Sequence, residues 1–518
     1  MNKIFFFCAF MAVIAIGCKK TEVQEPTRLF RPVIEGQLSA DSNTIVASWL
    51  RISGAKSYVF QISHDTFRTI DKTLNLDTSI AIVKGLLFNQ LYQVQVKAVA
   101  PDTVLNSKWS NLGAIKTLTS ILNIPGVSDI TFSSVRVTWK TKGAAVTSVK
   151  IVKKSNSSVA AQVTLTAADV LAENKIVTGL EGGTAYTIYL YSGTDERGYV
   201  DFTTKAPFAG TVIDLSGITG RPSVLADTIP IIPSGSTVLL GRGQTYNIAS
   251  AINLSKSVVI ISKPDLAITA QAKIYFTNNF NFTAGATIDS LEFNDVYMYS
   301  DNYAARYVFN TTANGTVGKI KFMNSTMEIF RGLCRLQSGT TSVGSFIINN
   351  CIVDSISGFA VLTAGVATTK VDNISFTNST FYKIEKVIVS ASPSVSVVID
   401  ACTFNEAPFG NNSFYIDYGT TLAVTSGITV SNCIFGVAKV SGGTYNIKDF
   451  RASPSTIMNA NNNYRTFDHV STGNDFPSIQ VYNRTAVLLW TDPYAGNFKI
   501  ADNTFPGRST SGDPRWRL

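Results

Sequence analysis

The segment ISFTNSTF, residues 374–381, is the clearest copy of a pattern that recurs five times between residues 320 and 435. The other copies are IKFMNST (320–326), IINNCI (347–352), VVIDACTF (397–404) and ITVSNCIF (428–435). Each copy has alternating apolar residues, a turn residue and a new apolar run. The turn positions 324, 350, 378, 401 and 432 are 26, 28, 23 and 31 residues apart. Such periods are typical of stacked coils, and the alternation predicts short strands joined at a tight corner.

The composition agrees with a large all-β protein. The chain has 518 residues, of which 15% are charged and 11% aromatic, with 31 Phe and 19 Tyr. This length allows about two to four domains. The formal net charge of +9 favours anionic partners, with surface solubility as the alternative. Basic residues are not clustered, so the sequence predicts no nucleic-acid partner.

The first residues are typical of an export signal. Lys3 precedes an apolar run over residues 4–16, which is too short to cross a bilayer. The run ends in Ala15-Ile16-Gly17-Cys18, which resembles a bacterial lipoprotein box, although the usual Leu is replaced by Ala15. The resemblance implies a signal peptide over 1–17, a lipid on Cys18, a tether over 18–30, and membrane contact through the lipid anchor only. The alternative is an ordinary signal peptide with an incidental Cys.

Two segments, residues 31–118 and 122–205, carry the same set of core signals. Each has a Trp on an early strand and a Leu six residues before a Tyr; these residues are Trp49, Leu86 and Tyr92, then Trp139, Leu180 and Tyr186. Such a Trp, and a Tyr whose hydroxyl bonds the upstream backbone, are hallmarks of β-sandwiches. Both segments resemble fibronectin type III domains. We therefore expect these side chains in the core, and not as sugar-binding platforms.

The remaining segment, residues 207–518, resembles the right-handed parallel β-helix of the pectate-lyase superfamily. The resemblance implies an inward ladder of corner amides, formed by Asn324, Asn350, Asn378 and Asn432. Asn tolerates the left-handed backbone that a corner requires. The last coil needs a cap, because an exposed strand edge invites pairing with another chain. The segment from residue 498 to the ending GDPRW (512–516) is predicted to supply it.

The predicted fold class is therefore all-β, with two fibronectin type III β-sandwiches followed by a right-handed parallel β-helix. The whole arrangement resembles surface lipoproteins of Bacteroidetes from polysaccharide-utilisation systems, whose helical domains are often of unassigned function.

Three cysteines share one offset in the repeat. Cys351, Cys402 and Cys433 each follow the turn residue, and equivalent residues of neighbouring coils lie about 4.8 Å apart. A ladder of buried thiols is the favoured interpretation. A disulfide between Cys402 and Cys433 is the alternative, since an exported chain permits one.

Enzymes of this fold act through motifs that the chain lacks. The aspartate-pair, histidine and arginine–lysine motifs of its hydrolases and lyases do not occur in the helical region. The sequence holds only two histidines, His64 and His469, which argues against a histidine triad or a multi-histidine metal site.

Counting along the repeat gives one candidate site. Four residues past the turn stand Glu328 and Asp354, which would be neighbours on consecutive coils. Seven residues past it stand Arg331 and Glu385, and Lys386 follows. Such a carboxylate pair with nearby cations could act as base and acid or hold a calcium ion, Ca2+, through Glu328 and Asp354. Solvent-facing charge is the alternative.

A second candidate lies in VYMYSDNYAARY, residues 296–307. Tyr299, Asp301, Tyr303 and Arg306 in this excursion could form a sugar-binding surface. Aromatic faces cover the apolar side of pyranose rings, and the polar side chains bond hydroxyls or carboxylates. Ordinary strand packing of the tyrosines is the alternative.

These observations favour a binding protein over an enzyme. The leading hypothesis is a lipid-anchored glycan-binding protein of the outer membrane, exposed at the cell surface. It would capture a polysaccharide, a pectic and anionic one in the first instance, for an outer-membrane glycan transporter complex. A polysaccharide lyase is the second hypothesis, and a structural or adhesive surface protein is the third. The periplasmic face remains the alternative location.

Overall fold

The computed structural model describes residues 27–410, 413–438 and 447–518, and these divide into two compact units between Ala206 and Pro207. The export signal and Cys18 lie outside the described residues. Within the described ranges no helix has the length and apolar character needed to span a membrane.

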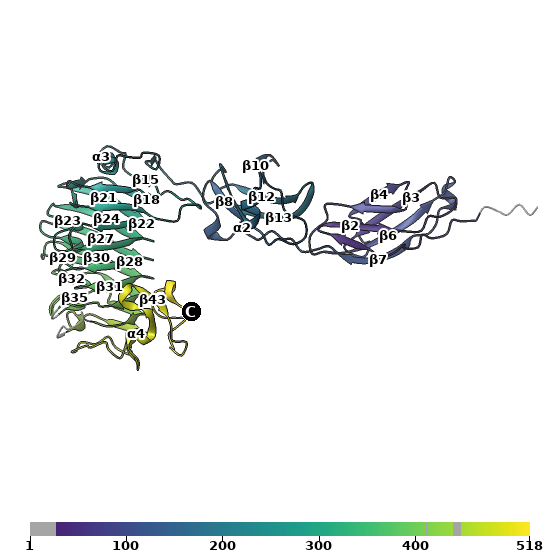
Figure 1. Ribbon diagram of the computed structural model, residues 1–518. Coiled ribbons are helices and arrows are strands. Elements are labelled where there is room, and N and C mark those ends of the chain that lie inside the picture. The colour runs from purple at the N-terminus through teal and green to yellow at the C-terminus, as the bar shows by residue number, and fades with distance from the viewer. Residues whose placement is uncertain (1–26, 411–412, 439–446) are drawn as a thin grey trace, which may run out of the picture. The chain divides into compact units, whose positions relative to one another are not determined.

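The first unit contains two antiparallel β-sandwiches (Figure 1). In the first sandwich one sheet has the order β1 (Ser39–Asp41), β2 (Thr44–Ser48), β5 (Ile80–Val83). The other sheet has the order β4 (Lys72–Leu76), β3 (Ser57–Ser63), β6 (Leu91–Val99), β7 (Ser110–Lys116). In the second sandwich β11 (Asn174–Thr178) pairs with β8 (Ser134–Thr138). Its larger sheet has the order β10 (Val159–Thr164), β9 (Ser148–Lys153), β12 (Ala185–Ser192), β13 (Asp195–Thr203).

The two sandwich cores confirm the interpretation of their aromatic residues. Trp49 is fully buried and Trp139 nearly so, each in the centre of its own cluster. The Tyr92 hydroxyl accepts a hydrogen bond from the Leu87 N–H at 3.1 Å. The Tyr186 hydroxyl likewise accepts from the N–H of residue 181 at 2.9 Å. Both tyrosines thus return their hydroxyls to the upstream backbone, as expected for fibronectin type III-like domains.

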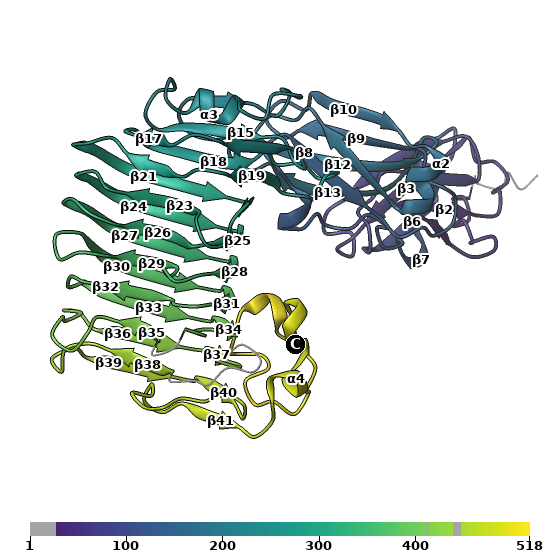
Figure 2. The ribbon, with the colours of Figure 1, turned by 60° about the vertical axis from the view of Figure 1, so that its left-hand side comes forward.

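The second unit is a parallel β-solenoid built from three sheets. The first sheet contains β14 (Val212–Asp214), β15 (Ser236–Leu240), β18 (Val258–Ser262), β21 (Ala286–Asn294), β24 (Gly315–Met323), β27 (Thr341–Asn349), β30 (Lys370–Thr377), β33 (Ser396–Asp400), β36 (Ile428–Ser431) and β39 (Met458–Asn461). The second sheet contains β16 (Thr245–Ile248), β19 (Ala272–Phe276), β22 (Val296–Ser300), β25 (Thr326–Phe330), β28 (Ile352–Ile356), β31 (Thr380–Ile384), β34 (Thr403–Asn405), β37 (Ile434–Phe435), β40 (Tyr464–Thr466) and β41 (Gln480–Tyr482). The third sheet contains β17 (Ile252–Leu254), β20 (Phe280–Phe282), β23 (Tyr307–Thr311), β26 (Gly332–Leu336), β29 (Leu362–Ala364), β32 (Ile388–Ser390), β35 (Phe414–Asp417) and β38 (Lys448–Arg451). Figure 2 shows the coils stacked in chain order.

The corner between the first and second sheets has the predicted left-handed backbone. Its φ angles lie between 51° and 55° at the five repeat positions, Asn324, Asn350, Asn378, Ala401 and Asn432. The side-chain amides form a ladder, in which Asn350 Nδ2 donates to Asn324 Oδ1 at 2.8 Å.

The predicted inward orientation of this ladder is wrong. Asn324 and Asn350 are exposed, and the next residue in each coil is buried. The left-handed residue turns its own side chain to solvent, and its successor takes the inward position. That inward position is the one that Cys351, Cys402 and Cys433 occupy.

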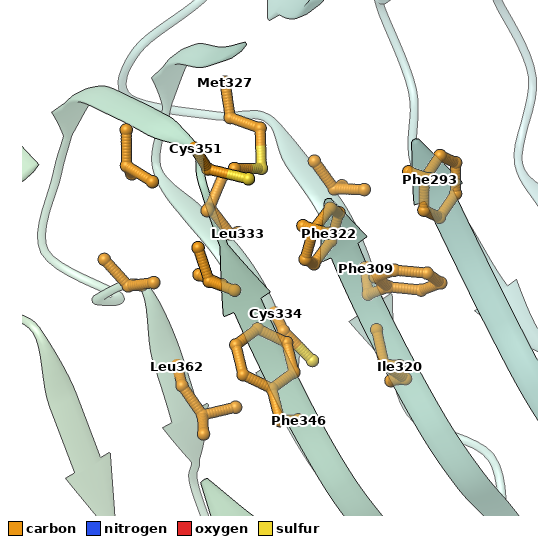
Figure 3. Packing of buried hydrophobic residues seen from close by; sticks show 14 of the residues in the cluster. Phe293, Phe309, Ile320, Phe322, Met327, Leu333, Cys334, Phe346, Cys351 and Leu362 are labelled. Atoms are coloured by element: carbon orange, nitrogen blue, oxygen red, sulfur yellow. The ribbon is translucent and has the colours of Figure 1, made fainter. Parts of the chain in front are cut away.

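The solenoid interior is filled by stacked apolar side chains. Phe404 stacks on Phe381 at a centroid distance of 5.0 Å and on Phe435 at 5.3 Å. Figure 3 shows Cys334 and Cys351 packed among phenylalanine, leucine and methionine side chains. The four described cysteines are buried free thiols, which agrees with the packing interpretation and not with a disulfide.

The C-terminal segment, residues 486–518, lies along the outer face of the second sheet, whereas we predicted a cap over the last coil. It contains α4 (Ala486–Leu489), β42 (Trp490–Asp492), the 3-10 turn η3 (Pro493–Ala495), β43 (Asn497–Ile500) and the 3-10 turn η4 (Pro514–Trp516). Figure 2 shows this segment beside β34 and β37. Asp513 Oδ2 accepts from Thr380 Oγ1 at 2.8 Å, and Arg515 Nη2 donates to Asn350 Oδ1 at 2.8 Å. The segment therefore bridges several coils from the side.

Candidate functional site

A left-handed residue in the second sheet creates extra outward positions. Ile329, Ser355 and Lys383 have φ angles of 63°, 54° and 54°. The ladder continues on both sides of this residue, because Glu328 pairs with Asp354 and the residues two positions later also pair. Each of these strands therefore turns two consecutive side chains outward before the next one returns to the core.

Glu328, Asp354 and Tyr382 form one outward column on three consecutive strands. The register pairs Glu328 with Asp354, and Asp354 with Tyr382, as the repeat offset predicts. Neighbouring strands of a sheet lie about 4.8 Å apart, so the two carboxylates are neighbours. All three side chains are half-buried.

Both carboxylates of the column are held by hydroxyl groups. The Tyr297 hydroxyl donates a hydrogen bond to Glu328 Oε1. Asp354 Oδ1 accepts from Ser355 Oγ at 2.8 Å. Burial, and then the Glu328 hydrogen bond, raises the pKa of Tyr297 well above its ordinary value. Burial and the neighbouring Asp354 carboxylate raise the pKa of Tyr382 likewise. Both phenols therefore remain protonated donors at neutral pH.

Neighbouring tyrosines with tilted rings extend this column toward earlier coils. Tyr275 pairs in register with Tyr299, and their rings lie 4.9 Å apart. Tyr297 and Tyr299 face outward from the same strand, with ring centroids 5.2 Å apart. The sequence interpretation missed Tyr275 and did not include Tyr297 among the predicted binding residues. The signal was the shared alternation of β19 and β22, in which each Tyr stands between buried residues.

The loop before β23 joins the two predicted candidate groups into one face. Burial raises the pKa of Tyr303, whose hydroxyl bonds Ser357 and lies near the charges of Glu385 and Asp354. Ser357 Oγ also donates to Glu385 Oε2 at 3.2 Å. Tyr303 therefore reaches from the excursion to the carboxylates, which the sequence interpretation treated as separate.

Asp301 and Arg306 hold this loop together. Arg306 Nε and Nη2 donate to the two Asp301 carboxylate oxygens at 2.6 and 3.1 Å. This bidentate pair lowers the pKa of Asp301 and raises that of Arg306, chiefly through the hydrogen bonds. The pair closes the loop that carries Tyr303, and both side chains remain partly exposed.

Arg331, Glu385 and Lys386 do not form the predicted cluster of charges. Arg331 and Glu385 are separated by the coil of Ser357, since Phe330 pairs with Ile356. Arg331 instead lies over the ring of Phe359, with its guanidinium carbon 4.5 Å from the ring centroid. Across the described ranges, no ion pair joins Lys386 or Arg331 to a carboxylate.

The C-terminal segment closes one end of this face. Thr380, Thr403 and Asn405 point outward from the second sheet and are nevertheless buried. The ring of Phe498 contacts Tyr382 at a centroid distance of 5.4 Å. A Cβ atom at Gly496 would lie 2.7 Å from the Tyr382 hydroxyl, so only glycine permits this approach. The open part of the face extends from β19 to β28, about 14 Å across four strands.

Glu328 and Asp354 are the two carboxylates of this face that the sequence offered as calcium ligands. In the part of the chain that the structure describes, no group of three or more His, Cys, Asp and Glu side chains converges on one point. A calcium ion takes six to eight oxygen ligands, and Glu328 and Asp354 are already engaged by hydroxyl donors.

Two family models match parts of the solenoid, and both describe domains of unknown function. One, DUF4957, matches residues 244–384, and the other, DUF5123, matches residues 397–516. The chain is similar to the FN1–FN3 domains of chicken CNTN1, at 14% identity and a TM-score of 0.17, over 35% of this chain and 68% of that one. It is also similar to a two-domain fibronectin type III segment of chicken tenascin, at 20% identity and a TM-score of 0.16, over 34% of this chain and 99% of that one. No curated protein matches the chain.

Proposed function

We propose that this protein binds a polysaccharide on the outer face of the second sheet, between β19 and β28. The observation that carries the proposal is the cluster of half-exposed, mutually tilted tyrosine rings, Tyr275, Tyr297 and Tyr299, beside the carboxylates Glu328 and Asp354. Tyrosine rings offer an apolar face to the apolar side of a sugar. Carboxylates accept charge-assisted hydrogen bonds from sugar hydroxyls.

The cellular setting of the proposal rests on the sequence. The lipoprotein-like box at Cys18 supports a lipid anchor in the outer membrane, with the protein exposed at the cell surface. The two fibronectin type III-like domains would act as spacers, and an outer-membrane glycan transporter would receive the polysaccharide. The arrangement resembles Bacteroidetes polysaccharide-utilisation lipoproteins. Pectic, anionic polysaccharides are the first class to test, because the formal net charge is +9.

Affinity electrophoresis tests the binding proposal. Gels cast with pectins, galactans and other polysaccharides should retard the full chain with at least one polymer. Tyr275→Ala combined with Tyr299→Ala should weaken the retardation at least tenfold, because the aromatic surface of this tyrosine pair is removed. Tyr199→Ala is the matched control, since Tyr199 is a tyrosine of the first unit with 39% exposure. Absence of retardation by every polymer would favour a structural or adhesive role.

The same protein preparation tests the lyase hypothesis. A lyase acting on pectin would release unsaturated uronides that absorb ultraviolet light, and Glu328→Gln with Asp354→Asn would abolish that release. We expect no absorbance change from the wild-type chain, because both carboxylates already accept hydrogen bonds from hydroxyl groups of the protein.

A further inference from the structure

Two arginines lie against the same aromatic ring at the edge of the proposed glycan face. The guanidinium carbon of Arg335 lies 3.7 Å from the centroid of Phe359, and that of Arg331 lies 4.5 Å from it. Tyr307 packs edge-on against the same ring, with centroids 5.9 Å apart. The two guanidinium carbons therefore lie no farther apart than the sum of their distances to the Phe359 centroid.

Neither guanidinium has a carboxylate partner among the described residues. Arg335 Nη1 donates to Gln337 Oε1 at 3.2 Å and to the Tyr307 hydroxyl at 3.4 Å, both neutral acceptors. Most other arginines of the solenoid do pair with an aspartate; these are Arg221, Arg242, Arg306, Arg451, Arg465, Arg484 and Arg515. Arg331 and Arg335 therefore lack a direct ion-pair partner, while the nearby carboxylate of Glu385 lies beside Gly358, the residue before Phe359.

We propose that Arg331 and Arg335, stacked on Phe359, bind an oxyanion substituent of the glycan, a carboxylate or a sulfate ester. Stacking on a ring covers the flat face of a guanidinium and leaves its N–H edge free for a bidentate contact. Two like charges held near one ring repel each other, and a bound anion would offset that repulsion. The inference rests on the proposed function and adds the chemical class of the ligand.

This anion site is continuous with the tyrosine and carboxylate face. The Phe359 N–H donates to the Arg331 carbonyl at 3.0 Å, so the two residues lie on adjacent coils. Ser357, two residues before Phe359, bonds the Tyr303 hydroxyl and Glu385. A glycan on the tyrosines could therefore extend to Phe359 without leaving the protein surface.

The neighbouring acids restrict which anionic glycan fits. Glu328, Asp354 and Glu385 lie on the same face and would repel a polymer that carries a charge on every sugar. They accept hydrogen bonds from neutral sugar hydroxyls instead. The geometry therefore favours a mainly neutral glycan with acidic groups spaced apart.

Affinity electrophoresis with four polymers tests this inference on the full chain. Hyaluronan alternates a uronate with a neutral sugar, κ-carrageenan carries one sulfate per disaccharide, polygalacturonate is charged at every sugar, and β-1,4-galactan is neutral. The variants are Arg331→Gln with Arg335→Gln, and the lysine pair Arg331→Lys with Arg335→Lys, which keeps the charge. Arg451→Gln is the matched control, because Arg451 also stacks on a phenylalanine, at 4.5 Å, but is paired with Asp417.

We expect the glutamine pair to lose at least tenfold in affinity for hyaluronan or κ-carrageenan, and less than twofold for galactan. Which of the two polymers responds identifies a carboxylate or a sulfate ester. The lysine pair should show an intermediate loss, because it lacks the planar fork. An equal loss for galactan, no loss at all, or tightest wild-type binding to polygalacturonate would overturn the inference.

A separate measurement distinguishes failure of this inference from failure of the proposed function. If the wild-type chain binds neither these four polymers nor any of the pectins, galactans and other polysaccharides named above, the proposed function fails. Phenylglyoxal modification of Arg331 and Arg335, mapped by peptide mass spectrometry, then decides the anion site. Slower modification in the presence of glucuronate or sulfate would support anion binding at Arg331 and Arg335. Unchanged modification would refute it as well.

Discussion

Phe404→Ala tests whether stacked rings hold the coils of the solenoid together. Phe404 has no exposed surface, and its ring lies parallel to Phe381 and Phe435 at an interplanar angle of 11° in each case. Tyr415 contacts it edge-on at 5.1 Å. Truncation of a buried Phe to Ala costs about 3–5 kcal/mol, and aromatic pairs contribute about 0.5–1.5 kcal/mol each beyond their buried area. We therefore expect a cost at the upper end, about 4–5 kcal/mol.

Guanidinium-induced unfolding of the full chain, followed by circular dichroism, measures this cost in the transition of the second unit. Phe404→Leu should cost only about 1–2 kcal/mol, because it keeps most of the volume and loses only the ring contacts. Phe467→Ala is the surface control, since Phe467 is 68% exposed and should change the unfolding free energy by less than about 0.5 kcal/mol.

The coupling between coils gives a second readout of the same ladder. Phe381→Ala and Phe404→Ala remove a shared contact, so the double variant should lose less than the sum of the single variants. Additive losses, or a Phe404→Ala cost below about 1.5 kcal/mol, would contradict the argument that the stacked rings act as one unit.

Three further predictions concern single contacts. Tyr92→Phe should lower the unfolding free energy of the first sandwich by about 1 kcal/mol in chemical denaturation, because the Leu87 N–H loses its acceptor; no change would refute that role. Asn350→Ala should cost about 1–2 kcal/mol in the same assay, and Asn350→Gly clearly less, since φ is 53° there. The hydrogen bond from Tyr482 is the main cause that lowers the pKa of Asp502 to about 2, from 3.8. The stabilisation from this carboxylate is complete above pH 4 and is lost as the pH falls toward 2. The melting temperature of Asp502→Asn should therefore fall less between pH 4 and pH 2 than that of the wild type. An equal fall in both proteins would contradict this role of Asp502.

The repeat predicts the fold because every second side chain in each copy is apolar, and only one orientation of the strand buries all of them. The register between coils follows from the spacing of residues 324, 350, 378, 401 and 432, and that spacing correctly places Glu328 beside Asp354. The orientation at the corner does not follow, because a left-handed residue reverses which neighbour faces inward. The same limit explains the wrong orientation predicted for Asn324 and Asn350.

Contacts between distant segments were beyond sequence reasoning. The bond between Tyr303 and Ser357 links a loop to a coil 54 positions later, and no periodicity marks it. The C-terminal segment has no repeat of its own, so its course along the second sheet, with Asp513 against Thr380, could not be read from the pattern.

The left-handed residue in β25, β28 and β31 explains how a regular solenoid can carry an irregular site. In a plain strand every outward residue alternates with a core residue, so a new surface group changes the register of the core. The left-handed residue adds one outward position per coil and returns the next side chain to the interior, as Phe330 and Ile356 show. The added outward positions are those of Ile329, Ser355 and Lys383; they lie beside Glu328 and Asp354, which ordinary alternation after the buried Met327 and Val353 already turns outward. Because Ile329 is β-branched and has a φ of 63°, its backbone is strained. Ile329→Gly should accordingly stabilise the fold while leaving the register of the face unchanged.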